Sequence, residues 1–279
     1  MAALFRWRDG LMREAFLSVP EGGPIFRLGI CPRQWFSLAV IGAFLNALGI
    51  LFGGLFGLAT RNHISAPTQL FFKASLGFFT VLLGLRLVYE NVQGGFGPGL
   101  KQLLLAGVAV ILGYWIGKIL HLQHLSNRLG RHAGRLIDDA QKNPPGKPAD
   151  GFLAATILFC AAPLGLIGAV TDGSTGFFLL LGLKAVMDGM ATTTFVKLFP
   201  WPAALSAIPV FLFLYGLTLA VHLWAEPWLE AHGLVHPVNT TAGLLACVVA
   251  LVIFEVRRVE LANYLPALVV APLLAWWLA

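Results

Sequence analysis

Long apolar stretches, separated by shorter polar segments, recur along most of this chain. They are continuous rather than alternating, which is typical of helices and not of the strands of a membrane barrel. A helix needs roughly 20 apolar residues to cross a hydrocarbon core of about 30 Å. Eight stretches approach or reach that length, the last two being short: residues 35–59, 70–89, 100–120, 151–170, 176–196, 203–225, 238–254 and 263–278. The pattern therefore predicts an all-α, polytopic membrane helix bundle with about seven to eight transmembrane segments.

The longest polar segment, residues 121–150, divides the predicted bundle into two parts. A first transmembrane half at 34–120 holds three apolar stretches, and a second half at 151–279 holds five. Six basic residues lie in or beside this connector: Lys118, Arg128, Arg131, Arg135, Lys142 and Lys147. Because short basic loops stay in the cytoplasm, the connector is predicted to be cytoplasmic.

Residues 1–33 form a basic N-terminal extension with a different pattern, in which five arginines lie among apolar side chains. This pattern favours an amphipathic helix at the membrane surface, and a disordered basic tail is the alternative. If all eight stretches span, the extension and the connector fall on opposite sides. Either the extension then lies on the outer surface or one early stretch is re-entrant. We expect the extension to bind the lipid surface, a partner membrane protein or a second copy of the chain.

The two halves share a weak similarity. The segment Leu-Gly-Ile-Leu-Phe-Gly-Gly at 48–54 resembles Leu-Gly-Leu-Ile-Gly-Ala at 164–169, and Lys73-Ala74 resembles Lys184-Ala185. Units of three segments would have opposite orientations in the membrane, and such inverted repeats are typical of transporters. A chance resemblance explains these short matches equally well.

Composition and charge restrict the class of protein further. The chain of 279 residues is 58% hydrophobic and only 11% charged, whereas soluble domains are near 45–50% and about 25%. A soluble enzyme, a disordered chain and a fibrous protein are thereby excluded. The formal net charge of +6 lies mostly in polar segments, where anionic headgroups explain it without nucleic acid. No motif for a nucleophile, phosphate loop or metal site is present, so we expect no enzyme activity, cofactor or bound metal.

Lys184 and Asp188 are the most informative polar residues, because they lie near the middle of the stretch 176–196. Their i, i+4 spacing places them on one helix face, close enough to form an ion pair. Each charge costs about 2.5–3.5 kcal/mol to insert, so such residues usually face the bundle interior and mark a pathway. The pair is therefore a candidate solute, ion or proton site. The alternative is a self-neutralising pair that only fixes helix packing.

Other polar and helix-breaking residues accompany this pair. Asp172, Thr192 and Asn46 are candidates for the same solute or ion pathway, although a single Asn in such a helix often serves as an interhelical contact. Asp172 could hold a cation or cap the next helix. Pro163 and Pro266 are predicted helix breaks, because proline removes a backbone donor. Broken helices expose backbone groups to ligands in transporters, and a simple packing kink is the alternative for Pro163.

Three blocks, at 151–173, 183–189 and 262–268, together resemble the YdfK/YqgA-type family of bacterial inner-membrane proteins, whose function is unknown. The resemblance covers residues 40–279 and includes Asn46 in the opening motif. It implies a multi-pass protein of the bacterial inner membrane and gives no reaction. Two departures are Gly117-Lys118, where the family commonly has Gly-Glu, and the basic extension at 1–33. The matching motif residues are Phe159, Cys160, Pro163, Asp172, Gly173, Lys184, Asp188, Gly189, Asn263, Leu265 and Pro266.

Two functional hypotheses follow from these observations. The first is a transporter or channel for a small charged solute, with Lys184, Asp188, Asp172 and Asn46 lining a polar site near the bilayer midplane. The second is a non-catalytic subunit that stabilises a larger membrane protein complex through the same polar groups. The basic extension and the missing glutamate favour the second hypothesis for this chain.

Overall fold

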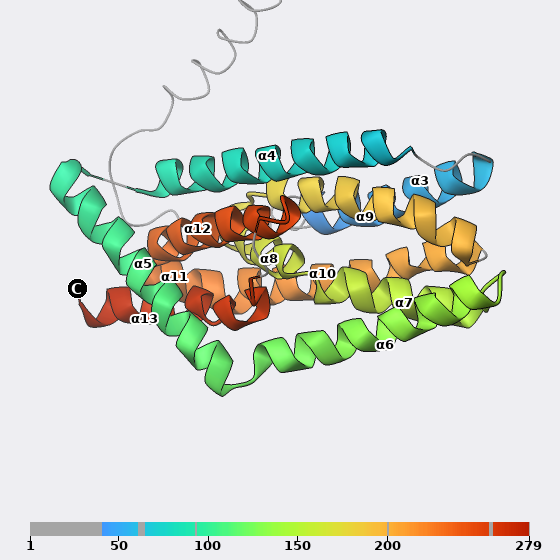
Figure 1. Cartoon of the computed structure of the whole chain (residues 1–279). Helices are drawn as coiled ribbons and strands as arrows, with labels where there is room; N and C mark the ends of the chain where they lie inside the picture. The colour runs from blue at the N-terminus through green and yellow to red at the C-terminus, as the bar shows by residue number, and fades with distance from the viewer. Residues whose placement is uncertain (1–40, 61–64, 93, 200, 257–258, 279) are drawn as a thin grey trace, which may run out of the picture. The chain divides into compact units, whose positions relative to one another are not determined.

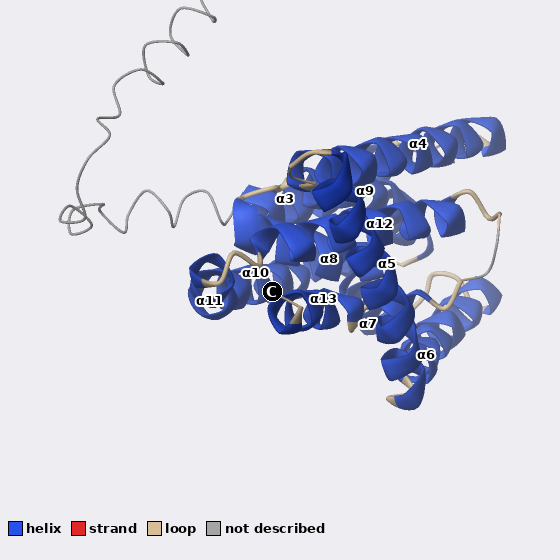
Figure 2. Cartoon of the chain, turned by 90° about the vertical axis from the view of Figure 1, so that its left-hand side faces the viewer, coloured by secondary structure: helices blue, strands red, loops and turns tan. Residues whose placement is uncertain are grey.

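The computed structural model describes residues 41–60, 65–92, 94–199, 201–256 and 259–278. Helices make up nearly all of this part of the chain, and it contains no strand, which confirms the all-α prediction (Figures 1 and 2). The extension at 1–33, Arg257 and Arg258 lie outside the described residues. The long helices are α3 (Ile41–Ala59), α4 (Ala66–Asn91), α5 (Phe96–Ile119), α6 (Leu122–Lys142), α9 (Leu179–Leu198) and α12 (Val235–Ile253).

Within the described residues, six helical segments are long and apolar enough to cross a membrane: Ile41–Ala59, Pro67–Asn91, Phe96–Ile119, Leu179–Leu198, Trp201–Ala231 and Val235–Ile253. The fifth combines η1 (Trp201–Ser206), α10 (Ala207–Ala220), η2 (Val221–Ala225) and α11 (Glu226–Ala231). A seventh candidate is the pair α7 (Pro148–Ala161) and α8 (Pro163–Thr175), bent by 57° at the break between them.

The eighth predicted stretch does not form a spanning helix. It folds into η3 (Leu261–Tyr264) and α13 (Ala267–Trp277), and the apolar helix Leu261–Trp277 is too short to count among the spans. Pro266 lies directly before α13 with right-handed helical backbone angles, and the 3-10 turn η3 passes there into the α-helix. The described part therefore holds six or seven candidate spans, the lower end of the expected number.

Small residues bring α3 and α9 into direct backbone contact. A Cβ placed on Gly49 would overlap the backbone of Ala185, and one on Gly53 would overlap the backbone of Gly189. A Cβ on Gly57 would lie 2.8 Å from the Cα of Thr193. The contacting residues advance in the same direction along α3 and along α9, so the two helices are parallel. Close approach through small residues is a common way for helices to associate in lipid, where packing replaces the hydrophobic driving force.

The spans α4 and α12 pair in antiparallel fashion. Gly84 of α4 and Gly243 of α12 each approach the backbone carbonyl of the other, and Gly77 lies against Phe254 at the far end of the same contact. The pairing holds the first half of the chain against the second. The inverted repeat is not confirmed by these contacts and stays a prediction.

The polar connector forms the amphipathic helix α6, which runs beside α7 in Figure 1. Ala133 and Ala140 are buried on its inner face, where the second packs in a cluster with Phe199 at the end of α9. The Gly146 N–H donates to the carbonyl of Leu198 at 3.1 Å. The connector is therefore hydrogen-bonded to the end of α9. Its arginines, Arg128, Arg131 and Arg135, are exposed on α6.

Candidate functional site

Lys184 and Asp188 form an ion pair one turn apart on α9. The lysine is 1% exposed and the aspartate 6%, so neither charge reaches the outside of the described helices. Two charges removed from water need each other and further hydrogen bonds to offset their lost hydration. The next contacts show where those additional partners come from.

Asn46 of α3 is the additional partner of the pair. Its Nδ2 donates to Asp188 Oδ2 at 3.0 Å, across 142 residues of sequence. The glycine contact with α9 begins at Gly49, less than one turn further along α3, and it brings the short asparagine side chain within reach. The second amide atom, Asn46 Oδ1, is buried and has no hydrogen-bond partner within the described structure.

Thr192 lies one turn beyond Asp188 and contacts its backbone rather than its carboxylate. Its Oγ1 donates to the Asp188 carbonyl at 2.7 Å, a bond within a single helix that is common for buried threonine. The predicted pathway residue is therefore buried beside the pair but does not bind the charged atoms. The ionic core of the site consists of Asn46, Lys184 and Asp188.

The broken span α7–α8 encloses the lysine. Ala162, between the two helices, has extended backbone angles of φ −67° and ψ 120°, and Pro163 follows it without a backbone N–H to continue the α7 ladder. The ring centroid of Phe159, before the break, lies 5.9 Å from Lys184 Nζ, within range of a cation–π interaction. After the break, a Cβ on Gly165 would come 2.8 Å from Lys184 Cε. The absence of a side chain there makes room for the lysine stem.

Asp172 lies apart from this pair, near the end of α8. It is 1% exposed, and its carboxylate faces Gly42 of α3, where a Cβ would come 2.5 Å from Oδ2. Neither carboxylate oxygen accepts a hydrogen bond from a side chain of the described structure, and the backbone N–H of Gly42 is a polar group that approaches the carboxylate. The predicted site residues therefore form two groups, which α3 links through Asn46 and Gly42, four positions apart.

A second buried polar network joins α4, α5, α8 and α12. Asn239 Nδ2 donates to Asn91 Oδ1 at 3.4 Å, and Ser174 Oγ donates to Asn239 Oδ1 at 3.2 Å. Gln102 Nε2 donates to the carbonyl of Asn91 at 2.7 Å and to Thr240 Oγ1 at 3.2 Å. The sequence analysis missed this network. In the sequence, the members of this network are visible only as polar residues at the ends of apolar stretches. Such residues do not by themselves indicate that four helix ends meet.

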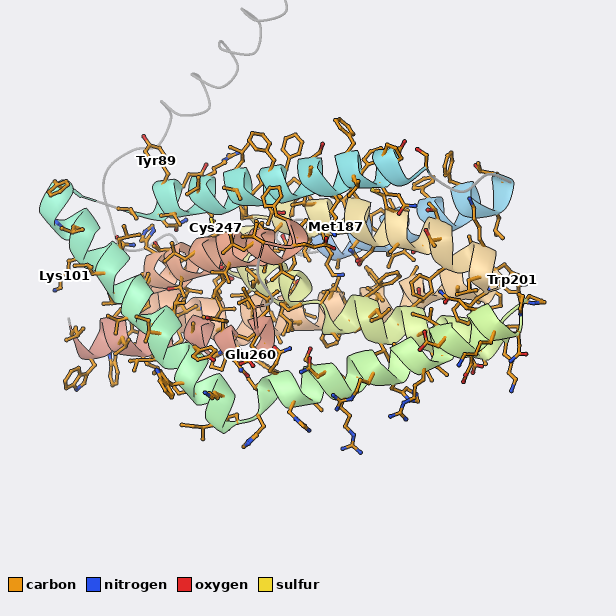
Figure 3. The ribbon with its side chains drawn as sticks, viewed as in Figure 1. Tyr89, Lys101, Met187, Trp201, Cys247 and Glu260 are labelled. Carbon is orange, nitrogen blue, oxygen red and sulfur yellow. The ribbon has the colours of Figure 1, made fainter. Side chains whose placement is uncertain are left out.

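A third polar cluster surrounds Asn263, one of the residues that match the family motifs. Asn263 Oδ1 accepts from the backbone N–H of Gln123 at 3.0 Å, while its Nδ2 donates to Glu260 Oε2 at 2.9 Å. Gln123 Oε1 in turn accepts from the Ala262 N–H at 3.1 Å. Figure 3 shows Lys101 and Glu260 near opposite ends of α5, so this cluster lies far from the polar network at Gln102. Asn263 thus links η3 to α6, and Pro266 follows it three residues later at the start of α13.

The fold and the site define the class of this molecule: a multi-span helical membrane protein with buried charged and polar groups at a broken helix. The chain belongs to the family described as protein of unknown function DUF554, which matches residues 41–276. It is similar to the uncharacterized protein YqgA of Escherichia coli (strain K12), with 29% identity over 245 residues, covering 86% of this chain and 98% of the relative.

A second relative is the uncharacterized membrane protein YdfK of Bacillus subtilis (strain 168). It is 23% identical over 235 residues, covering 84% of this chain and 94% of the relative. No solved structure matches the chain. The matches confirm the family resemblance seen in the sequence, and the printed names assign no activity to either relative.

Proposed function

We propose that this protein is a transporter or channel for a small charged solute in the bacterial inner membrane, with its polar site around Lys184, Asp188 and Asn46. The observation that carries the proposal is the break in α7–α8 beside the buried lysine, since Phe159 and Gly165 contact its stem and ammonium from either side of the break. Discontinuous helices beside buried charges are the usual construction of solute sites in transporters.

The chemistry of the site supports a charged solute. An ionic solute can compete with either member of the ion pair for its partner, because Lys184 and Asp188 neutralise each other when no solute is bound. Asn46 Oδ1 offers a buried acceptor with no partner in the described structure, which would favour a solute that also carries a hydrogen-bond donor. A zwitterion or a small ammonium-bearing solute meets both requirements.

The proposal is tested in vesicles reconstituted with the full chain. Amino acids, small carboxylates, amines and inorganic ions are applied in turn, and the solute current is recorded, meaning either uptake of the isotope-labelled solute or electrical current across the membrane. We expect a current with at least one solute, and its loss in the double variant Lys184→Met with Asp188→Leu. Exposed Asp138→Asn on α6 is the matched control, because it removes a carboxylate far from the site. No current with any solute for the wild-type protein would contradict the proposal.

A stabilising subunit of a larger membrane complex is the second candidate. The observation that favours it is an open apolar groove of about 510 Å³ between α3, α4 and α9, lined by Phe52, Phe56 and Phe72 among others. Such a groove suits the side chains of another membrane helix. The ion pair itself is buried against Asn46 of the same chain, so it needs no partner protein to cover it. Co-purification with a defined membrane complex would favour this second candidate.

A further inference from the structure

Asp172 differs from the ion pair, because its carboxyl group is buried without a charged partner. It is 1% exposed, and neither oxygen accepts a hydrogen bond from a side chain of the described structure; the backbone N–H of Gly42, which approaches it, carries no charge. An isolated carboxylate charge is very unfavourable in such a place, and a buried carboxyl group is normally paired, bound to a cation or neutral. The residue therefore requires something that neutralises it.

No charged side chain of the described structure pairs with Asp172. The elements packed against α8 are α3, α7, α9, α10, η2 and α12. Their titratable residues are Asp150, Cys160, Lys184, Asp188, Lys197, Tyr215, His222, His236 and Cys247, and α3 contributes none. Lys184 forms its ion pair with Asp188, and no other titratable side chain of these elements hydrogen bonds to the Asp172 oxygens. Neutralisation therefore comes from a small ion.

The surroundings of the carboxyl group favour a proton over a metal cation. Sodium and divalent ions are held by several oxygen ligands at once. A Cβ on Gly42 would come 2.5 Å from both Asp172 Oδ2 and Leu181 Cδ1, so this side of the carboxyl group faces the backbone of α3 beside an apolar side chain of α9. A proton needs no such ligand shell. Among the described residues, Asp172 also belongs to no group of three or more potential metal ligands.

Polar side chains lead from the turn that holds Asp172 to a surface cavity. Thr175 Oγ1 donates to the carbonyl of Thr171 and accepts from Asn239 Nδ2, while Ser174 Oγ donates to Asn239 Oδ1. His236 Nδ1 is 3.2 Å from Asn91 Oδ1, which accepts from Asn239 Nδ2. His236 lines a cavity of about 340 Å³ together with Lys101 and Gln102. We define this series, from His236 to Thr171, as the polar column.

We propose that Asp172 is a proton-binding site, separate from the Lys184–Asp188 pair and reached along the polar column. The carboxyl group holds the proton when α3 packs against it, and it releases the proton to water in the cavity when that contact opens. The inference deepens the proposed function and rests on it for its role. Because Gly42 and Asn46 lie on the same helix, a movement of α3 that opens the solute site would also uncover Asp172.

The proton itself is tested by infrared spectroscopy on the reconstituted full chain at neutral pH. We expect a C=O stretching band of a protonated carboxylic acid, its loss in Asp172→Asn, and its retention in the exposed control Asp138→Asn. A wild-type protein without this band, or a band that survives in Asp172→Asn, overturns the proposal. The band should also be unchanged when sodium chloride replaces choline chloride. A band that falls as sodium rises identifies a metal ion as the occupant and overturns the proton site.

The access route is tested by the rate at which the same band shifts in heavy water. Ser174→Ala and Asn239→Leu interrupt the polar column, and we expect slower deuteration in both. Thr156→Val is the matched control, since this threonine donates to the Phe152 carbonyl within α7 and lies outside the column. Equal rates in all variants overturn the route. No solute is needed, so a protein with this band but no solute current would contradict the proposed function and leave the proton site intact.

Discussion

At the scale of single residues, the Lys184–Asp188 pair makes the sharpest prediction about stability. Removing one member of a buried pair typically costs about 3–5 kcal/mol, whereas replacing both with apolar residues is often neutral. We expect Lys184→Met and Asp188→Leu each to lower the thermal midpoint and the folded yield in detergent. The double variant should recover both, because no unpaired charge remains.

The same variants separate structure from transport. A transport site predicts that the recovered double variant still lacks the solute current, because the groups that compete for the solute are gone. A pair that only fixes helix packing predicts instead that stability and current recover together. A double variant with full current would remove the pair from the mechanism and leave Asn46 and Asp172 as the remaining candidates.

Single residues also show which contacts of the site could be predicted from the sequence. The i, i+4 spacing was sufficient to predict the ion pair, because the partners lie on one helix and helical geometry determines their contact. The contact between Asn46 and Asp188 was not predictable in the same way, since it depends on which two of the spans pair. Asn46 was identifiable only as a polar residue in lipid, and the glycines beside it indicated a close contact without naming its partner.

At the scale of elements, the α3–α9 contact should be the least tolerant of larger side chains. Gly53 has no room for a Cβ beside the Gly189 backbone, so Gly53→Leu would force the helices apart. Overpacking typically costs about 1–3 kcal/mol, and separation would also break the Asn46–Asp188 bond. We expect a clear loss of thermal stability in detergent. Gly107→Leu on α5 is the control, because a Cβ there meets nothing within 4 Å; equal losses in both variants would contradict the role of this contact.

The element scale explains which helix predictions succeeded. The long spans followed from uninterrupted apolar length, which is a property of the chain alone. The C-terminal stretch at 263–278 was counted as a candidate span although it is short, and it forms the short helix Leu261–Trp277. The start of that helix is held by the hydrogen bond between Asn263 and Gln123, 140 residues earlier in the sequence, and no local pattern contains that information.

At the scale of the whole molecule, the parallel contact of α3 and α9 constrains the membrane topology. If α4, α5 and the bent pair α7–α8 each cross once, α9 starts on the same side as α3 and the two helices are parallel, as observed. A re-entrant α7–α8 would reverse α9. We therefore expect α7–α8 to cross the membrane, with the connector on the cytoplasmic side because of its basic residues.

Cysteine labelling tests this topology in cells that carry a variant with its three native cysteines replaced. Asn143→Cys lies at the exposed end of the connector helix and should react with an impermeant thiol reagent only after the cells are opened. Gly95→Cys, in the exposed link between α4 and α5, should react in intact cells. The reverse result for this matched pair would invert the orientation, and labelling of both from one side would contradict the crossing of α5.

The pairing of α4 with α12 has a consequence for biosynthesis. The ribosome delivers α4 more than a hundred residues before its partner, so the nascent protein waits in the bilayer with Gly84 and Asn91 facing lipid or the insertion machinery. Assembly can finish only when the last sixth of the chain emerges, so the protein completes its folding late in synthesis. We expect a chain stopped after residue 234 to insert its early helices and yet be degraded quickly in a pulse-chase experiment, while the full-length chain persists.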